Sequence, residues 1–253
     1  MEVNACLERI NYAKPVKPDA QTLYGLHLAH LLAVPFENLD IGLKRKIHIS
    51  ERAIYEKVVV NKRGGFCYEL NGLFGWLLKQ IGFDVTYLNA RVFNSEGAPG
   101  IGFGHLALLV RIPNQHEIFL ADVGFGDSFI EPLDFNNRDE QIQSLRAYRL
   151  EQVLQEYVLW QKDYQGTWAK QYLFDLTPHN FPDEYEAGCH YHQTSPNSTF
   201  TKRNIISRVS KGGRITLEED RLIVTVNGKR SERSLNSQDE YNALLKEFFG
   251  IVL

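Results

Sequence analysis

The sequence Arg63-Gly64-Gly65-Phe66-Cys67-Tyr68-Glu69-Leu70-Asn71 places a cysteine directly after a glycine turn, at the start of a predicted helix. Apolar residues follow at helical spacing: Leu70, Leu73, Phe74, Leu77 and Leu78. Glycine permits the backbone angles of a sharp turn into a helix. A thiol in the first helical turn lies at the positive end of the helix dipole, which favours the thiolate. Because the thiolate is the nucleophilic form, Cys67 is a candidate for covalent catalysis.

A cysteine alone is weak evidence, because free cysteines more often pack as small apolar side chains. We interpret Cys6 and Cys189 in that way. For Cys67 the glycine turn leaves both readings open, since glycines also begin helices for structural reasons. Further residues are therefore needed.

Two downstream segments supply an imidazole and a carboxylate. His105 opens the apolar run 106–110, and Asp122 lies near the end of the run 118–123. Pro113, Asn114 and Gln115 between them indicate a turn. In an antiparallel pair the start of one strand faces the end of the other, so we expect His105 beside Asp122. Each residue alone has a structural explanation: a satisfied histidine and a strand-end cap.

Together, Cys67, His105 and Asp122 are the groups that a cysteine nucleophile requires. The base takes and returns protons, and the carboxylate orients the base. A thiolate beside an imidazolium has a pKa of roughly 3.5–7.5 and attacks acyl groups readily, including thioesters. The order Cys, His, Asp is of moderate specificity by itself, because the chain has eight histidines and many acidic residues.

Several motifs, taken in order along the chain, resemble the arylamine N-acetyltransferase family. They are Pro35–Leu39, Arg63–Asn71, Gly104–Leu106, Asp122–Gly126 and Ser195–Phe200, which span roughly the first 200 residues. The resemblance implies a ping-pong reaction with acetyl-coenzyme A as co-substrate and no metal. Cys67 takes the acetyl group, coenzyme A leaves, and an aromatic amine or hydrazine removes the acetyl group. His105 then assists proton removal, and Asp122 orients and stabilises His105.

The resemblance also implies a set of binding residues: Phe36, Phe103, Gly104, Gly124, Phe125, Gly126, Ser195, Asn197 and Phe200. Phe125 is expected to line the acceptor pocket, although a turn with one inward aromatic ring explains it equally well. Backbone amides near Cys67, or in the loop 102–104, are candidates for binding the oxyanion. The cations Lys202, Arg203, Lys211 and Arg214 suit the phosphates of coenzyme A, or they form a solvated basic hairpin.

Other polar residues are interpreted as structural. By resemblance, Glu37 and Arg63 form an ion pair near the cysteine helix. Asn71 lies one turn after Cys67 and bonds either the triad carboxylate or a buried backbone group. The run 189–192 contains a cysteine and two histidines, but no second cluster accompanies it, so we predict no metal site. His27 and His30 share a helix face without an evident carboxylate partner, which favours a core or surface role.

Composition limits the remaining classes. The chain has 253 residues, 43% of them hydrophobic, and a net charge of −3. A slightly acidic chain argues against broad nucleic-acid binding. The sequence has no apolar run of about 18 residues and no signal-like N-terminus, so we expect no membrane segment and no export. Three cysteines suit a reducing cytoplasm. The expected partners are small amines or hydrazines and coenzyme A.

The predicted fold is α+β with a cysteine-protease-like Cys-His-Asp core. Residues 1–83 form a helical bundle with Cys67, residues 84–195 an antiparallel β-barrel or sheet with His105 and Asp122, and residues 196–253 an α/β lid. Asp19, Ser50 and Ser237 are predicted helix caps. Further strands are expected at 85–92, 148–151, 157–161, 172–176 and around 205, 215 and 222–226. A short helix is expected from about 183, and the final helix is expected to run through 249.

Other functions are compatible with the same three residues. One is the amide synthase of the same family, which closes macrolactams. A transglutaminase or cysteine hydrolase, in which a lysine or water takes the acyl group, is less favoured. A catalytically inactive binding module is least favoured, because the full reactive set is present.

Overall fold

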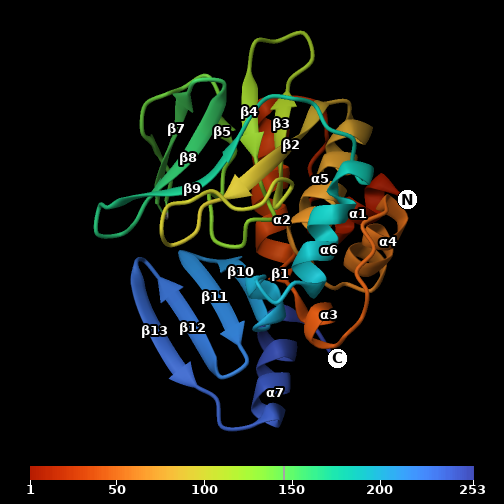
Figure 1. The fold of residues 1–253 in the computed structure, drawn as a ribbon. Helices are drawn as coiled ribbons and strands as arrows, with labels where there is room; N and C mark the ends of the chain where they lie inside the picture. Colours follow the sequence, from red (N-terminus) through yellow and green to blue (C-terminus); the bar gives the residue numbers. More distant parts are fainter. Residues whose placement is uncertain (145) are drawn as a thin grey trace.

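Helix α5 (Cys67–Ile81) is the buried centre of the helical part, which is drawn in red and orange in Figure 1. The computed structural model describes residues 1–144 and 146–253. Every α5 residue from Cys67 to Leu78 is buried. The neighbouring helical segments are α1 (Val3–Arg9), α2 (Ala20–Ala33), α3 (Leu39–Gly42), α4 (Glu51–Tyr55) and the π-helical η1 (Glu56–Val60). Of these, α1, α2, α4 and η1 pack apolar side chains against α5, in one core cluster.

The predicted helix caps are observed. Asp19 accepts a hydrogen bond from the Thr22 amide at 2.8 Å, and Ser50 caps α4 through the Ala53 amide. The helix that Ser50 caps becomes π-helical after Tyr55, as η1. Helix α5 begins at Cys67 as predicted and ends at Gly82, whose φ of 106° is readily adopted only by glycine.

An eight-stranded antiparallel sheet forms the central part, with the order β5-β4-β3-β2-β9-β8-β7-β6. Its strands are β2 (Asp84–Val92), β3 (His105–Arg111), β4 (Ile118–Ala121), β5 (Leu133–Asp134), β6 (Gln141–Ile142), β7 (Ala147–Val153), β8 (Glu156–Lys162) and β9 (Trp168–Phe174). The two end strands meet through Gln141, whose side chain bonds both the N–H and the C=O of Asp134 at 2.9 Å. The sheet is therefore nearly closed into a barrel, as expected.

Strand β3 is buried on both faces, which explains its continuous apolar run. Leu106, Leu108 and Val110 face the α5 cluster, whereas Ala107 and Leu109 face the barrel interior. This alternation follows from the two-residue period of a strand. In register, His105 pairs with Ala90, and Leu108 pairs with Ala121. The ends of β3 and β4 that carry the predicted site residues are thus adjacent.

The C-terminal part is a five-stranded antiparallel sheet in the order β1-β10-β11-β12-β13, with α7 (Gln238–Phe249) against it. The strands are β1 (Phe36–Glu37), β10 (Ile205–Ser210), β11 (Gly213–Glu218), β12 (Arg221–Val226) and β13 (Lys229–Ser234). Tyr241, Leu244, Leu245 and Phe249 of α7 share one core cluster with Leu217 and Leu222. Between β9 and β10 the chain forms η2 (Asp183–Tyr185), α6 (Glu186–Thr194) and η3 (Thr199–Thr201).

Some elements differ from the sequence-based expectation. Strand β13 was not predicted, because its six residues are exposed and carry no apolar alternation; charged residues are typical of an edge strand. Strand β9 begins at Trp168 rather than near 172, since its first residues pair with β8 outside the core. At α7, Ser237 caps the Glu240 amide, but the Glu240 carboxylate bonds Asn236 instead of Ser237.

The division into residues 1–83, 84–195 and 196–253 stays a prediction. Strand β1 comes from the first of these segments and pairs with β10 of the third. Across the residues that the structure describes, none of the helices combines the length and the apolar character that a bilayer span requires.

The glycine pair before Cys67 is needed for close packing. The reason predicted from the sequence, backbone angles that favour glycine, is wrong. Neither Gly64 nor Gly65 has a φ in the left-handed region. A Cβ on Gly64 would lie 2.0 Å from the Pro35 oxygen, and one on Gly65 would lie 2.7 Å from the Glu69 side chain. The Glu37 amide donates to the Gly65 oxygen at 2.8 Å. The turn therefore presses against the chain around β1.

We predict that Gly64→Ala lowers the free energy of unfolding by about 1–3 kcal/mol, because the added methyl group overlaps a backbone oxygen that cannot move freely. Urea unfolding followed by circular dichroism measures the change. Gly102→Ala is the matched control, since no described atom lies within 4 Å of its Cβ position. Equal stability of the two variants would contradict the packing explanation.

Candidate active site

Cys67, His105 and Asp122 come together from helix α5, the start of β3 and the residue after β4. All three are buried, with exposed fractions of 4%, 2% and 1%. His105 Nε2 lies 2.8 Å from Asp122 Oδ2, so the ring donates this proton to the carboxylate. Cys67 and His105 line the same cavity. The sequence-based expectation of an imidazole beside a carboxylate is therefore met.

The surroundings of His105 favour its charged form. Burial lowers the pKa of the ring, but the negative charge and hydrogen bond of Asp122, together with the nearby Cys67, raise that pKa to about 10. For Asp122, burial raises the carboxyl pKa, yet His105 and hydrogen bonds from Asn71 and Gly124 hold it below its usual value. The pair is thus an imidazolium and a carboxylate near neutral pH.

Asn71 bonds both of the partners that were expected as alternatives, the Asp122 carboxylate and buried backbone groups. Its side-chain N–H groups donate to Asp122 Oδ1 at 2.8 Å and to the Leu106 oxygen at 2.6 Å, and its oxygen accepts from the Val123 amide at 2.9 Å. The Gly124 amide donates to the same Asp122 oxygen at 2.9 Å. A Cβ on Gly124 would lie 2.8 Å from the Cys67 Cα, which explains the glycine.

A buried ion network holds the start of α5. The predicted pair is present, with Arg63 Nη2 at 2.8 Å from Glu37 Oε1. Lys57 lies 2.7 Å from Asp40 and 2.9 Å from Glu69, and Glu69 accepts from the Phe66 amide at 3.1 Å. Burial raises the pKa of Glu69 to about 7, although Lys57 acts against this shift. Sequence reasoning missed Lys57 and Asp40, because neither lies in a recognisable motif.

A cavity of about 460 Å³ opens onto Cys67 and His105. Its other walls include several of the predicted binding residues: Phe36, Gly104, Gly124, Phe125, Asn197 and Phe200. Sequence analysis did not single out the apolar lining residues Val92, Phe93 and Ile101. The cavity can hold a flat apolar group next to the sulfur.

Phe103 and Ser195, which were predicted to bind ligands, line neither this cavity nor the adjoining one. Phe103 packs edge-on against Tyr185, and its oxygen accepts from the Tyr68 hydroxyl at 2.6 Å. Ser195 accepts from the Asn197 amide at 3.2 Å. Their roles in binding stay predictions, and the contacts seen here are structural.

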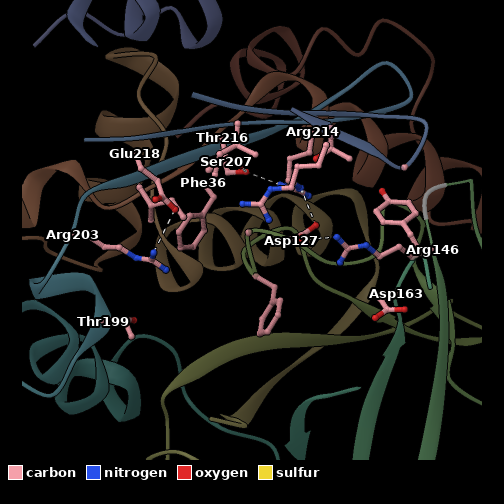
Figure 2. A pocket seen from close by; sticks show the side chains of 18 of the residues that line it. Phe36, Asp127, Arg146, Asp163, Thr199, Arg203, Ser207, Arg214, Thr216 and Glu218 are labelled. Atoms are coloured by element: carbon pink, nitrogen blue, oxygen red, sulfur yellow. Dashed lines mark hydrogen bonds and ion pairs between the residues drawn. The ribbon is translucent and has the colours of Figure 1, made fainter. Parts of the chain in front are cut away.

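A second cavity, of about 570 Å³, adjoins the first and shares Phe36, Phe125, Thr199 and Phe200 with it. Figure 2 shows this cavity, with arginines from different parts of the chain around it. Asp127 accepts from Arg146 at 2.8 Å and from Arg214 at 3.1 Å. Arg203 and Arg230 also line it, as does Gly126. Of the cations considered from the sequence, Lys202 and Lys211 do not line it, and Arg146 and Arg230 were missed.

Residues of the run 189–192 form hydrogen bonds within the protein. His192 lies 2.9 Å from the Gly104 oxygen through Nε2, and Cys189 bonds Gln193. Among the described residues, no group of three or more histidine, cysteine or acidic side chains has the arrangement of a metal site.

Comparison with known proteins gives consistent matches. A family model described as N-acetyltransferase matches residues 19–253. Arylamine N-acetyltransferase of Escherichia coli K12 is 33% identical over 98% of this chain and 88% of its own length. The enzyme of that name from Mycolicibacterium smegmatis is 31% identical over 100% and 93%.

Solved structures agree with these matches. The Salmonella typhimurium arylamine N-acetyltransferase superimposes with a TM-score of 0.92 at 32% identity, over 98% of this chain and 90% of that one. The Mycobacterium marinum arylamine N-acetyltransferase in complex with CoA also gives 0.92, at 29% identity over 99% and 93%.

We predict that the His105–Asp122 pair stabilises the fold in a pH-dependent way. Because folding raises the pKa of His105 from 6.5 to about 10, its contribution is complete below pH 6.5 and disappears as the pH rises toward 10. The stability difference between proteins with His105 and with His105→Gln should shrink over this range. Both proteins should carry Cys67→Ser, so that the thiol does not titrate.

Urea unfolding at several pH values measures this difference. A difference that is constant between pH 6.5 and pH 10 would show that folding does not raise the pKa of His105.

Proposed function

The chain belongs to the arylamine N-acetyltransferase family, and we propose that it transfers an acetyl group from acetyl-coenzyme A to an aromatic amine through a thioester on Cys67. One observation carries the residue assignment: a buried imidazole bonded to Asp122, at the wall of a cavity that Cys67 also lines. Burying an ion pair of this kind destabilises the fold unless hydrogen bonds satisfy both charged groups.

In the first half-reaction the Cys67 thiolate attacks the carbonyl carbon of the acetyl thioester. The new S–C bond forms as the bond to the coenzyme A sulfur breaks, and the His105 imidazolium gives its proton to the departing sulfur. One thioester replaces another, so this step is nearly balanced in free energy. Neutral His105, still held by Asp122, remains beside the acetyl-cysteine.

In the second half-reaction the amine nitrogen attacks the acetyl carbon. His105 takes the proton from nitrogen, the Cys67 thiolate leaves, and the imidazolium–thiolate pair is restored. Only an unprotonated amine can attack, and aromatic amines are largely neutral near pH 7. The apolar walls at Phe93, Phe125 and Ile101 favour such a ring over a charged alkylamine.

For the oxyanion, the amides at the start of α5 are better placed than the loop 102–104. The Phe103 amide donates to the Asn89 side chain at 2.5 Å, and the Gly104 amide donates to the Ile101 oxygen at 3.2 Å. Cys67 and Tyr68 are the first helical residues, whose amides have no acceptor within the helix. One such donor lowers the barrier by about 2.7–4 kcal/mol.

We assign the phosphates of coenzyme A to the arginine-lined cavity. Arg146, Arg203 and Arg214 supply planar donor groups that match phosphate oxygens. The residues shared by the two cavities, Phe36 and Phe125 among them, lie where a pantetheine arm would pass toward Cys67. The Mycobacterium marinum relative is known in complex with CoA.

We further propose that hydrazines are accepted and that the enzyme works in the cytoplasm. An arylhydrazine presents a neutral, unhindered nitrogen to the same apolar cavity. All three cysteines are free and buried, which suits a reducing compartment.

Incubation with acetyl-coenzyme A tests the proposed reaction. We expect the intact mass of the protein to increase by one acetyl group on Cys67, and an aromatic amine to discharge it much faster than water does. Cys67→Ser should form no such adduct and should keep the wild-type circular dichroism spectrum. A wild-type protein that hydrolyses the adduct as fast as it transfers the group would indicate a hydrolase.

The phosphate assignment predicts that Arg214→Gln raises the KM for acetyl-coenzyme A about tenfold, because one charge-assisted bond is lost. The value of kcat should change less than about twofold. The KM of the variant should also depend less on salt concentration. Arg233→Gln, on an exposed residue of β13 that does not line the cavity, is the control. Equal KM values for both variants would place the phosphates elsewhere.

A further inference from the structure

We propose that His27 is a positioning residue for the acetyl transfer, because its ring binds both ends of the segment that runs from Asp122 to Ile130. The expected effect on acetyl transfer rests on the proposed function. The assignment of His27 as an anchor of this segment rests on geometry alone. His27 lies on α2, far in sequence from the residues that it holds, and it touches neither cavity.

The two hydrogen bonds determine the state of the ring. Nδ1 lies 3.0 Å from the Ile130 oxygen, and Nε2 lies 3.2 Å from the Asp122 nitrogen. A carbonyl oxygen only accepts and a backbone amide only donates. The proton must therefore be on Nδ1, and Nε2 must be an unprotonated acceptor. A protonated ring would present Nε2–H to the Asp122 N–H and lose that bond.

The core keeps the ring in this state. His27 is fully buried, stacks on Phe129 with centroids 5.7 Å apart, and meets Phe74 edge-on. Burial lowers the pKa of His27 to about 4, although the bond to the Ile130 oxygen and the charge of Asp122 act in the opposite direction. The two bonds thus persist across the pH range in which the reaction occurs.

The segment held by His27 contributes residues to the Cys67–His105–Asp122 group and to both cavities. It begins with the carboxylate that orients His105 and continues through Gly124, Phe125 and Gly126, which line the two cavities. It then reaches Asp127, which pairs with Arg146 and Arg214. Anchoring both ends restricts every residue between them, so the bond to the Asp122 amide limits where the triad carboxylate can lie.

His30 provides a control within the same helix. It is 2% exposed and also packs edge-on against Phe74, with ring centroids 5.6 Å apart. Within the described part of the chain, neither of its ring nitrogens has a hydrogen-bond partner. Substitution of His30 therefore measures how much activity is lost when a buried imidazole on this helix is replaced and no hydrogen bond is removed.

Asparagine and glutamine separate the two bonds of His27. The terminal amide of asparagine reaches the position of Nδ1, so His27→Asn can keep the bond to Ile130 but loses the bond to Asp122. The amide of glutamine reaches the position of Nε2, so His27→Gln can keep the bond to Asp122. His30→Asn and His30→Gln are the matched controls.

We expect His27→Asn to lower kcat/KM for acetyl transfer about tenfold, through kcat rather than the KM of acetyl-coenzyme A, because the triad carboxylate is displaced. It should slow the alkylation of Cys67 by iodoacetamide as well, which measures the triad without acetyl transfer. His27→Gln should retain at least about a third of the activity, and both His30 variants should stay within about twofold of wild type. His27→Asn activity equal to that of His30→Asn would overturn the proposal.

Nitrogen-15 NMR of the wild-type histidine rings gives a test that needs no variant to fold and no catalysis. A neutral ring with the proton on Nδ1, together with slow exchange of the Asp122 amide, is the expected result. A proton on Nε2 would rule out the anchor. Absence of acetyl transfer by the wild type would instead remove the proposed function and leave the ring assignment standing.

Discussion

The site depends on keeping the Asp122 carboxylate charged at a position almost without water. A buried carboxylate of this kind is tolerated only when its oxygens are satisfied by donors and by an opposite charge. His105 supplies the charge, and Asn71 and the Gly124 amide supply the remaining donors. The same bonds hold the imidazole at the wall of the cavity that Cys67 also lines. The requirement to satisfy one carboxylate therefore fixes the position of His105, the proposed base.

A second set of buried charges fixes the start of α5, the helix that carries Cys67, the proposed nucleophile. Arg63 and Lys57 neutralise Glu37, Asp40 and Glu69 in part, and Glu69 bonds the amide before Cys67. Glu37 also belongs to β1, which pairs with the C-terminal sheet through β10. The position of Cys67 is thus tied to the C-terminal sheet as well as to the helical core. Gly64 and Gly65 are required because this connection brings the backbone of two segments into direct contact.

The two cavities meet at a common group of aromatic and polar residues. The acetyl donor and the acceptor can therefore bind in separate cavities that adjoin each other. The charged end of a thioester donor requires charged side chains, whereas an aromatic acceptor requires apolar ones. The two cavities differ accordingly in charge. Both cavities include Phe125, a residue of the segment between the two His27 anchors. One buried histidine outside the site therefore influences the donor side, the acceptor side and the triad together.

The amino-acid sequence by itself determined the start of α5 at Cys67, the caps at Asp19 and Ser50, the strands that carry His105 and Asp122, and the order of the three reactive groups. These features depend on neighbours within a few residues or on a short periodic pattern, so local chemistry is sufficient. Motif resemblance added the family, which the comparisons confirmed. It could not assign Lys57, Arg146 or His27, because each acts on a residue far away in the chain. Only the tertiary structure decided that α2 reaches the Asp122 amide, that Gly64 is needed for contact with Pro35, and that exposed β13 completes a sheet. In the first two cases the deciding interaction joins distant segments, and no local pattern records it. Strand β13 instead pairs with the adjacent β12 across the Asn227-Gly228 turn, but its exposed residues carry no apolar alternation.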